Sequence, residues 1–181
     1  MLTRYDSDSM PTDIKSLVRE VPNFPKPGIV FRDITPLLRD PKAFSEAIDL
    51  MTAFAQKQSA EIIAAPESRG FIFAAAMAVR AGIGFVPIRK PGKLPWKTRG
   101  ASYALEYGTD RLEIHEDAIR PRQRVLLVDD VLATGGTMKA CCDLIHEADA
   151  HVAGISFLIE LAALGGRKRL GSLPIHSVMT F

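Results

Sequence analysis

Two adjacent carboxylates and a turn rich in threonine and glycine are the residues of this chain whose types and spacing most clearly suggest chemistry. Asp129 and Asp130 follow the apolar run 125–128, and a Thr-Gly-Gly-Thr turn comes shortly after them at 134–137. A short Val/Leu run bounded by a turn is typical of a parallel strand that is buried on both faces. Because open α/β sheets bind ligands just beyond the carboxyl ends of their strands, this turn lies where a ligand is expected.

The turn itself is suited to a phosphate monoester. Gly135 and Gly136 allow the backbone to curl with its N–H groups pointing inward, and the start of the next helix adds a positive field. Thr134 and Thr137 add hydroxyl donors. The two carboxylates would repel this phosphate, so they are better suited to sugar hydroxyls or to a divalent cation held by a second phosphate group. A ribose 5-phosphate that carries another anionic group satisfies both requirements.

A simple helix cap and a nucleoside triphosphate P-loop both account poorly for this segment. A helix cap needs only one Asp, Ser or Thr, and it explains neither the paired acids nor the two glycines between two threonines. A P-loop is excluded because no Lys follows the glycines, and the chain contains no G-x-G-x-x-G pattern.

Residues 125–137 resemble the phosphoribosyl-pyrophosphate motif of the type I phosphoribosyltransferase family, and three other segments resemble those of its adenine-using members. The resemblance extends from about Ile14 to the C-terminal end. It implies an α/β fold with a single domain over 14–181, in which helices flank a mostly parallel twisted sheet. A small N-terminal hood at about 14–36 and a flexible hairpin loop are expected, after a polar, frayed N-terminus at 1–13.

The family motif implies a role for each residue around the turn. Asp129 and Asp130 are expected to hold the ribose. Mg²⁺ is expected as a cofactor that is held mainly by the substrate, with these two carboxylates as its candidate protein ligands. The 5-phosphate is expected to bind the turn, at Ala133, Thr134, Gly135, Gly136 and Thr137.

A second segment is expected to bind pyrophosphate. Glu67, Ser68 and Arg69 follow a predicted strand at 61–65 and open a helix, so they lie at the same edge of the sheet. Arg69 has a planar donor fork suited to phosphate oxygens, although an Arg at a helix start is more often solvated. In the family this loop binds pyrophosphate through backbone amides and contains a cis peptide at the position of 67–68. Glu67 departs from the Asp found in some members.

The stretch 89–99 concentrates positive charge in a chain whose formal net charge is only +2. A run of this kind is usually a solvated surface loop. In the family, however, the corresponding residues reach pyrophosphate, some of them from the neighbouring subunit, so Arg89 and Lys93 are expected to bind it. The same resemblance predicts a homodimer, with the helix that starts near Phe71 and Phe73 as an adjacent contact.

Residues 101–115 alternate polar and apolar side chains around a turn at 108–110, which indicates a hairpin. The segment resembles the mobile catalytic loop of the adenine-using members, and Glu106 falls on their catalytic glutamate. A carboxylate on a loop that closes over the site can accept a purine proton while a ring nitrogen attacks the anomeric carbon. Tyr103 would help to close the pocket over the pyrophosphate. Without the resemblance, Glu106 would be an exposed hairpin residue.

Residues 21–36 carry four prolines and no periodicity, which favours a lid or hood over a core element. Within them, 24–34 resembles the family's adenine-recognising hood. Val30 and Arg32 are expected to bind adenine through main-chain groups, and Phe31 is expected to stack on the ring.

The remaining segments alternate apolar runs with helical patterns, as in a mostly parallel α/β sheet. With 181 residues, 47% of them hydrophobic and 24% charged, the chain is long enough for one domain with a sizeable core. The expected strands lie at 61–65, 85–89, 125–129 and 151–160, and the expected helices at about 42–57, 70–81 and 135–148.

Several classes of protein are not indicated. The near-neutral charge predicts no nucleic-acid partner, and the absence of an apolar run of ~20 residues predicts no membrane partner. The first ten residues lack the apolar segment of a secretory signal. Cys141 and Cys142 are adjacent, so they suit neither a disulfide nor a metal site, and reduced thiols fit a cytoplasmic protein.

The resemblance therefore implies purine salvage by a transferase that converts adenine and 5-phosphoribosyl 1-pyrophosphate to AMP and pyrophosphate. Two alternatives stay open. One is a transferase for another purine base, such as hypoxanthine or xanthine. The other is a non-catalytic regulator that senses phosphoribosyl pyrophosphate, although such proteins usually add a DNA-binding domain and no helix-turn-helix segment is evident.

Overall fold

The computed structural model describes residues 13–104 and 109–181, and for 102–104 and 109–110 it describes the backbone alone. Within these residues no helix is both long enough and apolar enough to cross a bilayer. The chain divides into two compact units, the second of which begins at Ile48.

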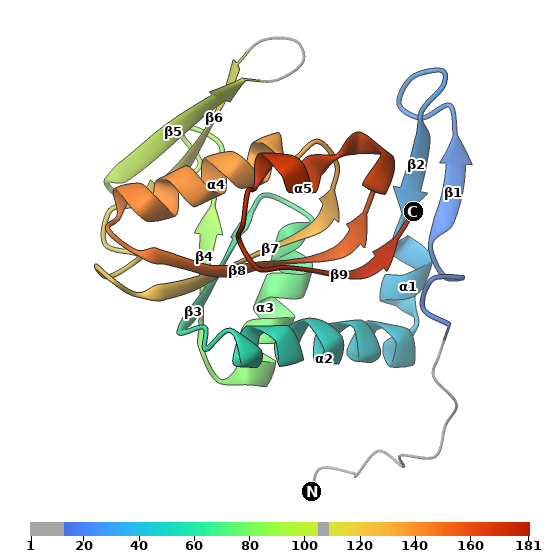
Figure 1. Cartoon of the computed structure of the whole chain (residues 1–181), viewed down its shortest axis with the longest axis horizontal. Coiled ribbons are helices and arrows are strands. Elements are labelled where there is room, and N and C mark those ends of the chain that lie inside the picture. Colours follow the sequence, from blue (N-terminus) through green and yellow to red (C-terminus); the bar gives the residue numbers. More distant parts are fainter. Residues whose placement is uncertain (1–12, 105–108) are drawn as a thin grey trace, which may run out of the picture. The chain divides into compact units, whose positions relative to one another are not determined.

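The larger unit is built on a sheet of parallel strands. Its described strands are β3 (Ile62–Pro66), β4 (Gly84–Ile88), β7 (Arg124–Leu132), β8 (His151–Glu160) and β9 (Ile175–Thr180). They lie in the order β4-β3-β7-β8-β9 (Figure 1), which confirms the expected parallel α/β sheet. The chain moves outward from β3 to β4 and then returns to the other side of β3 as β7. The direction of winding therefore reverses between β3 and β7, and such folds bind ligands at the carboxyl ends of these strands.

Strand β7 forms the centre of this sheet. Its apolar residues 125–128 have no exposed surface, because neighbouring strands pair with both of its edges. Pairing with β8 continues past the apolar run as far as Leu132, which lies opposite Glu160. The expected strand end at Asp129 is therefore wrong. Asp129 and Asp130 both lie within β7, and the turn begins only after Leu132.

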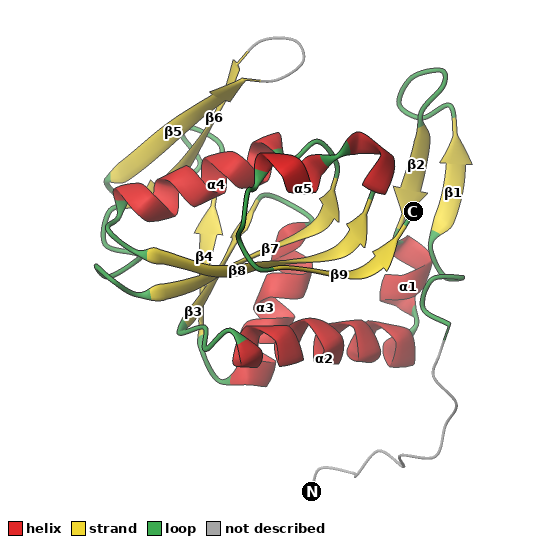
Figure 2. Cartoon of the chain, viewed as in Figure 1, coloured by secondary structure: helices red, strands yellow, loops and turns green. Residues whose placement is uncertain are grey.

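Helices cover both faces of the sheet. Helix α3 (Gly70–Ala81) lies on one face and α4 (Gly136–Glu147) on the other (Figure 2). These two helices are confirmed, with ends displaced by at most one residue from the expected ones. Phe73 of α3 has no exposed surface, because its ring is buried in the core. The expected contact of this helix with a second subunit stays a prediction. Cys141 and Cys142 are buried in α4 and unpaired.

The elements that follow β8 are not predicted by the sequence. They are a 3-10 helix η1 (Ala162–Leu164), the short helix α5 (Gly166–Arg169) and the strand β9. The second half of α2 (Pro41–Lys57), a helix that the sequence does predict, packs beside β9. There the Phe54 ring stacks on the His176 ring, with 5.1 Å between their centroids.

A two-stranded antiparallel ribbon lies beside α4 (Figure 1). Its strands are β5 (Thr98–Ala104) and β6 (Thr109–His115). The predicted hairpin is thereby confirmed, but Thr109 and Asp110, which were expected in its turn, pair with β5 instead. The residues that join the strands, Glu106 among them, lie outside the described residues. Arg99 donates a hydrogen bond of 2.8 Å to the carbonyl oxygen of Glu147 and ties the ribbon to the end of α4.

The smaller unit contains the predicted hood. It consists of an antiparallel pair, β1 (Arg19–Pro22) and β2 (Val30–Asp33), followed by the helix α1 (Thr35–Arg39). The rings of Phe24 and Phe31 meet edge to face, with 5.2 Å between their centroids. Arg32 of β2 bonds to Glu20 of β1. The stretch therefore contains regular structure, and its strands are too short to produce a readable periodicity.

Candidate active site

The predicted phosphate turn joins the end of β7 to the start of α4. Gly135 caps α4 with a φ of +80°, a conformation that strains any residue with a Cβ. The first backbone N–H groups of an α-helix have no partner within the helix, and the helix dipole is positive at this end. The start of α4 is therefore able to bind an anion.

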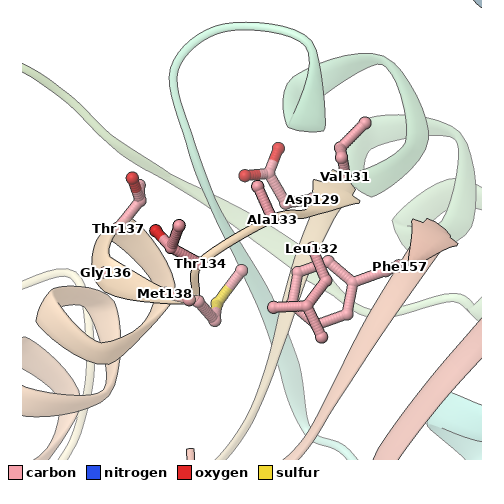
Figure 3. Close-up of a pocket in the computed structure, with 10 residues that line it drawn as sticks. Asp129, Val131, Leu132, Ala133, Thr134, Gly136, Thr137, Met138 and Phe157 are labelled. Carbon is pink, nitrogen blue, oxygen red and sulfur yellow. The ribbon is translucent and has the colours of Figure 1, made fainter. Parts of the chain in front are cut away.

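A small pocket of about 80 Å³ opens at this turn (Figure 3). Ala133–Thr137, the five residues expected to bind the 5-phosphate, all line it, together with Asp129. The hydroxyls of Thr134 and Thr137 and the carboxylate of Asp129 lie on the same side of the turn (Figure 3). Since a single water needs on the order of 10–15 Å³ of such space, the pocket has room for a group of the size of phosphate.

Sequence reasoning missed the apolar wall of this pocket. Leu132, Met138 and Phe157 lie below the turn in Figure 3, and each is almost completely buried. Phe157 is on β8, directly opposite Asp129 in the register of β7 and β8. That register joins residues far apart in the chain, so no local pattern reveals it. The wall keeps water from one side of the turn and strengthens the hydrogen bonds that the turn can make.

The two carboxylates of β7 have different surroundings. Asp130 is only 3% exposed and accepts a hydrogen bond from Nε of Arg69. Asp129 lines the pocket at the β7–α4 turn, and its Oδ1 accepts a hydrogen bond of 2.9 Å from the backbone N–H of Asp130. Burial raises the pKa of Asp129 well above its usual value, and the nearby charge of Asp130 raises it further. A ligand that brings hydroxyl donors or a cation to Asp129 would therefore stabilise its ionised form.

The start of α3 lies directly against this pair. A Cβ at Gly70 would lie 2.8 Å from Oδ1 of Asp129 and 3.0 Å from the carbonyl oxygen of Val128. Only glycine lets α3 begin so close to β7. This close approach brings Arg69 within reach of Asp130.

A second pair of opposite charges joins the ends of β3 and β4. Glu67 follows β3, and its carboxylate accepts a hydrogen bond from Nε of Arg89, which follows β4. This bond is the main cause that lowers the pKa of Glu67, and the charge of Lys93 lowers it further. The guanidinium of Arg89 also lies over the Phe71 ring, 5.9 Å from its centroid. The peptide between Glu67 and Ser68 is cis, as the resemblance implies.

Most of the predicted anion-binding residues are thus brought to one edge of the sheet. From β4 through β3 to β7, that edge carries the Arg89–Glu67 pair, then the Arg69–Asp130 pair, then the phosphate turn. Each guanidinium is held by a carboxylate, so the two cations have fixed positions at this edge.

The remaining predicted site residues belong to other parts of the chain. Glu106 lies outside the described residues, and so does the side chain of Tyr103. Val30, Phe31 and Arg32 belong to the smaller unit. Their roles in catalysis and in binding pyrophosphate and adenine stay predictions.

Asp129 and Asp130 are suited to only part of a metal site. In the part of the chain that the structure describes, no three His, Cys, Asp or Glu side chains gather in a way that could hold a metal ion. Mg²⁺ commonly binds one or two carboxylates together with the phosphates of a substrate. The two neighbouring carboxylates, one of them at the phosphate pocket, fit a magnesium ion of that kind.

Comparisons with known proteins agree with this geometry. Residues 35–172 match the family model described as the phosphoribosyl transferase domain. The adenine phosphoribosyltransferase of Symbiobacterium thermophilum is 57% identical over 169 residues, which are 93% of this chain and 99% of that protein. The adenine phosphoribosyltransferase of Chloroflexus aurantiacus is 54% identical, over 93% of this chain and 98% of its own length.

Solved structures are similar over the same extent. The crystal structure of adenine phosphoribosyltransferase from Thermoanaerobacter pseudethanolicus has a TM-score of 0.90 and 52% identity, covering 93% of this chain and 98% of that one. The Saccharomyces cerevisiae enzyme, solved in complex with adenine and an imino-altritol bisphosphate, has a TM-score of 0.88 and 37% identity. It covers 92% of this chain and 96% of its own.

Proposed function

This chain belongs to the phosphoribosyl transferase family and to its adenine phosphoribosyltransferases, and from this membership we propose that it converts adenine and 5-phosphoribosyl 1-pyrophosphate to AMP and pyrophosphate. The observation that supports the proposal is the pocket at the β7–α4 turn, where hydrogen-bond donors suited to phosphate lie beside the carboxylate of Asp129. Transfer to hypoxanthine or xanthine, and a purely regulatory role, are not favoured, because the similar proteins cited above are adenine enzymes.

The phosphate turn and the two aspartates would hold the ribose 5-phosphate. The backbone N–H groups and threonine hydroxyls of Ala133–Thr137 would bind the 5-phosphate in the pocket. Asp129 and Asp130 would bind ribose hydroxyls and offset the positive charge that develops on the sugar as the bond to pyrophosphate breaks. The raised pKa of Asp129 supports this role, because its carboxylate is poorly compensated without a ligand.

The neighbouring strand ends would bind the departing pyrophosphate. The backbone at Glu67 and Ser68, the guanidinium groups of Arg69 and Arg89, and Lys93 are the proposed contacts. Both guanidinium groups already pair with carboxylates, so pyrophosphate would compete with Asp130 and Glu67 for them. Mg²⁺, held by the substrate and by the carboxylates of β7, would neutralise charge that accumulates on pyrophosphate.

The remaining roles depend on the resemblance. Glu106 is the proposed base that accepts a proton from adenine, and Tyr103 would close over the pyrophosphate. Val30 and Arg32 would bind adenine through their main chains, and Phe31 would stack on it. Phe24 and Val30 are 51% and 43% exposed. This exposed apolar surface in the hood supports the binding of a flat base there.

We also propose that the protein is a homodimer in the cytoplasm. Ile72 and Val79 lie two turns apart on α3, and they are 40% and 86% exposed, which gives this helix an apolar outer face that a second copy could cover. Sedimentation should give a dimer at micromolar concentration, and Val79→Glu should weaken it. A monomer with full activity would contradict the dimer. The two buried, unpaired thiols fit a reducing compartment.

Incubation with Mg²⁺, 5-phosphoribosyl 1-pyrophosphate and each purine base in turn tests the proposed reaction. Adenine should give AMP and pyrophosphate in equal amounts, and hypoxanthine, guanine and xanthine should give little nucleotide. Nucleotide formed mainly from a 6-oxopurine would contradict the base assignment. Binding of phosphoribosyl pyrophosphate with no turnover of any base would favour a regulator.

A further inference from the structure

A cluster of charged and polar residues behind the phosphate turn has no part in the proposed reaction. Glu160 ends β8 and is 9% exposed. Arg167 of α5 donates to both of its oxygens: Nε donates to Oε1 at 2.8 Å and to Oε2 at 3.1 Å, and Nη2 donates to Oε2 at 2.7 Å. The hydroxyl of Ser177 on β9 donates to the same Oε2 at 2.7 Å. Arg167 also donates to the carbonyl oxygen of Ile175 at 3.1 Å, so one guanidinium joins α5 to both β8 and β9.

Helix α5 lies directly against the phosphate turn. A Cβ at Gly166 would lie 2.3 Å from the carbonyl oxygen of Ala133, and a Cβ at Gly135 would lie 2.7 Å from the carbonyl oxygen of Gly166. The two backbones therefore touch, with no side chain between them. Arg167 is the next residue after Gly166, so its bonds to Glu160 act on the segment that makes this contact.

Glu160 is also anchored to the strand that leads into the turn. It lies opposite Leu132 in the register of β7 and β8, and the N–H of Leu161 donates to the carbonyl oxygen of Leu132 at 2.9 Å. The pair thus holds both sides of the turn: Glu160 beside the strand before it, and Arg167 on the helix behind it. Arg167 holds the pKa of Glu160 below its usual value, so the ion pair persists at neutral pH.

We propose that Glu160, Arg167 and Gly166 are positioning residues for the 5-phosphate. They keep the backbone of Ala133–Gly135 in the conformation that aims its N–H groups into the pocket, without touching the substrate themselves. The turn contains two glycines and has high intrinsic freedom, so an external support lowers the entropy that binding must remove. The identity of the phosphate ligand rests on the proposed function.

Substitution of the charged pair tests this support. Arg167→Ala and Glu160→Gln should each raise the Kd for ribose 5-phosphate and the KM for phosphoribosyl pyrophosphate by about tenfold, as loss of an outer supporting contact does at metal-binding sites. The KM for adenine and kcat should change by less than threefold. Arg167→Lys keeps the charge but lacks the planar fork, so it should recover only part of the affinity. Lys168 follows Arg167 in α5 and is exposed, so Lys168→Ala is the matched control.

A second variant tests the backbone contact. Gly166→Ala places a methyl group against the carbonyl oxygen of Ala133 and should also weaken ribose 5-phosphate binding about tenfold. Gly171→Ala is its control, because Gly171 has a φ of +68° but a Cβ there would meet nothing within 4 Å. Both variants should lose stability, and only Gly166→Ala should lose phosphate affinity.

Calorimetry with ribose 5-phosphate separates this proposal from the proposed function. If the wild type binds ribose 5-phosphate but does not transfer the phosphoribosyl group of phosphoribosyl pyrophosphate to any base, the proposed reaction fails while the positioning role is still measured. Variants of the pair and of Gly166 that melt earlier yet bind ribose 5-phosphate within twofold of the wild type would overturn the positioning role. The cluster would then serve only to fasten β9 and α5 to the sheet.

Discussion

The aspartates of β7 should respond to the same substitution with opposite changes in stability. Asp129→Asn keeps the shape of the side chain and an oxygen that can accept the 2.9 Å hydrogen bond from the N–H of Asp130. It removes a charge that burial and Asp130 both disfavour. We expect the free enzyme to gain on the order of 1 kcal/mol, within the range of common stabilising substitutions. For a chain of this length that is about 2–4 °C in Tm.

Asp130→Asn should have the opposite effect. Asp130 is buried and bonds to Arg69, whose side chain is half exposed. Loss of its charge should cost about 1–2 kcal/mol, toward the lower part of the range for charged hydrogen bonds because solvent screens the arginine. Both variants should lose most of their affinity for phosphoribosyl pyrophosphate. The Asp129→Asn protein should therefore be more stable than the wild type but less active.

Urea unfolding at several pH values measures this effect. The folded chain releases the Asp129 proton at a higher pH than the unfolded chain, so the cost of its charge is complete above the folded pKa and absent below the unfolded one. The advantage of Asp129→Asn should therefore grow as the pH rises toward the folded pKa and disappear as the pH falls toward the ordinary aspartate value. Two results would contradict this reasoning: an Asp129→Asn variant that is less stable than the wild type at neutral pH, or a gain in its free energy of unfolding that does not change with pH. Either would show that the charge of Asp129 does not destabilise the free enzyme.

Three further substitutions test other parts of the site. Gly136→Val should lower the affinity for phosphoribosyl pyrophosphate at least about tenfold, because a β-branched side chain obstructs the turn. The circular dichroism spectrum should not change, and intact affinity would contradict the assignment of the turn. Glu106→Gln should lower kcat by about 10²–10⁴ with little change in KM, and activity within a few-fold of the wild type would make Glu106 a structural residue. Gly70→Ala should destabilise the protein by about 1–3 kcal/mol, because its Cβ would lie 2.8 Å from Oδ1 of Asp129. Gly84→Ala is its control, since a Cβ there would meet only the Ile62 side chain at 3.6 Å; equal melting temperatures for these two variants would contradict the close packing of α3 on β7.

The phosphate turn was predictable because its chemistry is local. Asp129 and the residues of the turn follow one another in the chain, and the buried strand before them has a continuous apolar sequence. Arg69 was predictable for the same reason, because a strand, a turn and a helix that follow one another in the chain place it at the carboxyl edge of the sheet. To predict such a site, it is enough to know that the strands are parallel and therefore end at one edge.

The residues that sequence reasoning missed depend on register and on short elements. Phe157 reaches the pocket only because β8 pairs with β7 so that it lies opposite Asp129. The Arg167–Glu160 pair is formed by a helix of four residues that has no apolar periodicity. Strand β9 mixes polar and apolar residues, because its side chains are mostly half-buried. No local pattern distinguishes these segments from a surface loop.

The extent of β7 was misjudged for a related reason. The sequence predicts a strand that ends at Asp129. Charged residues are rarely buried, so a pair of acids is an unusual continuation of a buried strand. Backbone pairing with β8 continues regardless, and the charge of Asp130 is accommodated by Arg69. A functional site is where such a local rule is expected to fail.

A crystal structure of the protein with AMP would decide whether the β7–α4 turn is the phosphate site. We expect the phosphate to occupy the pocket at this turn, with oxygens about 3 Å from the backbone nitrogens of residues 134–137. We also expect the ribose hydroxyls to contact Asp129 or Asp130. AMP bound with its phosphate elsewhere, and with the β7–α4 pocket empty, would contradict both expectations and the function proposed from them.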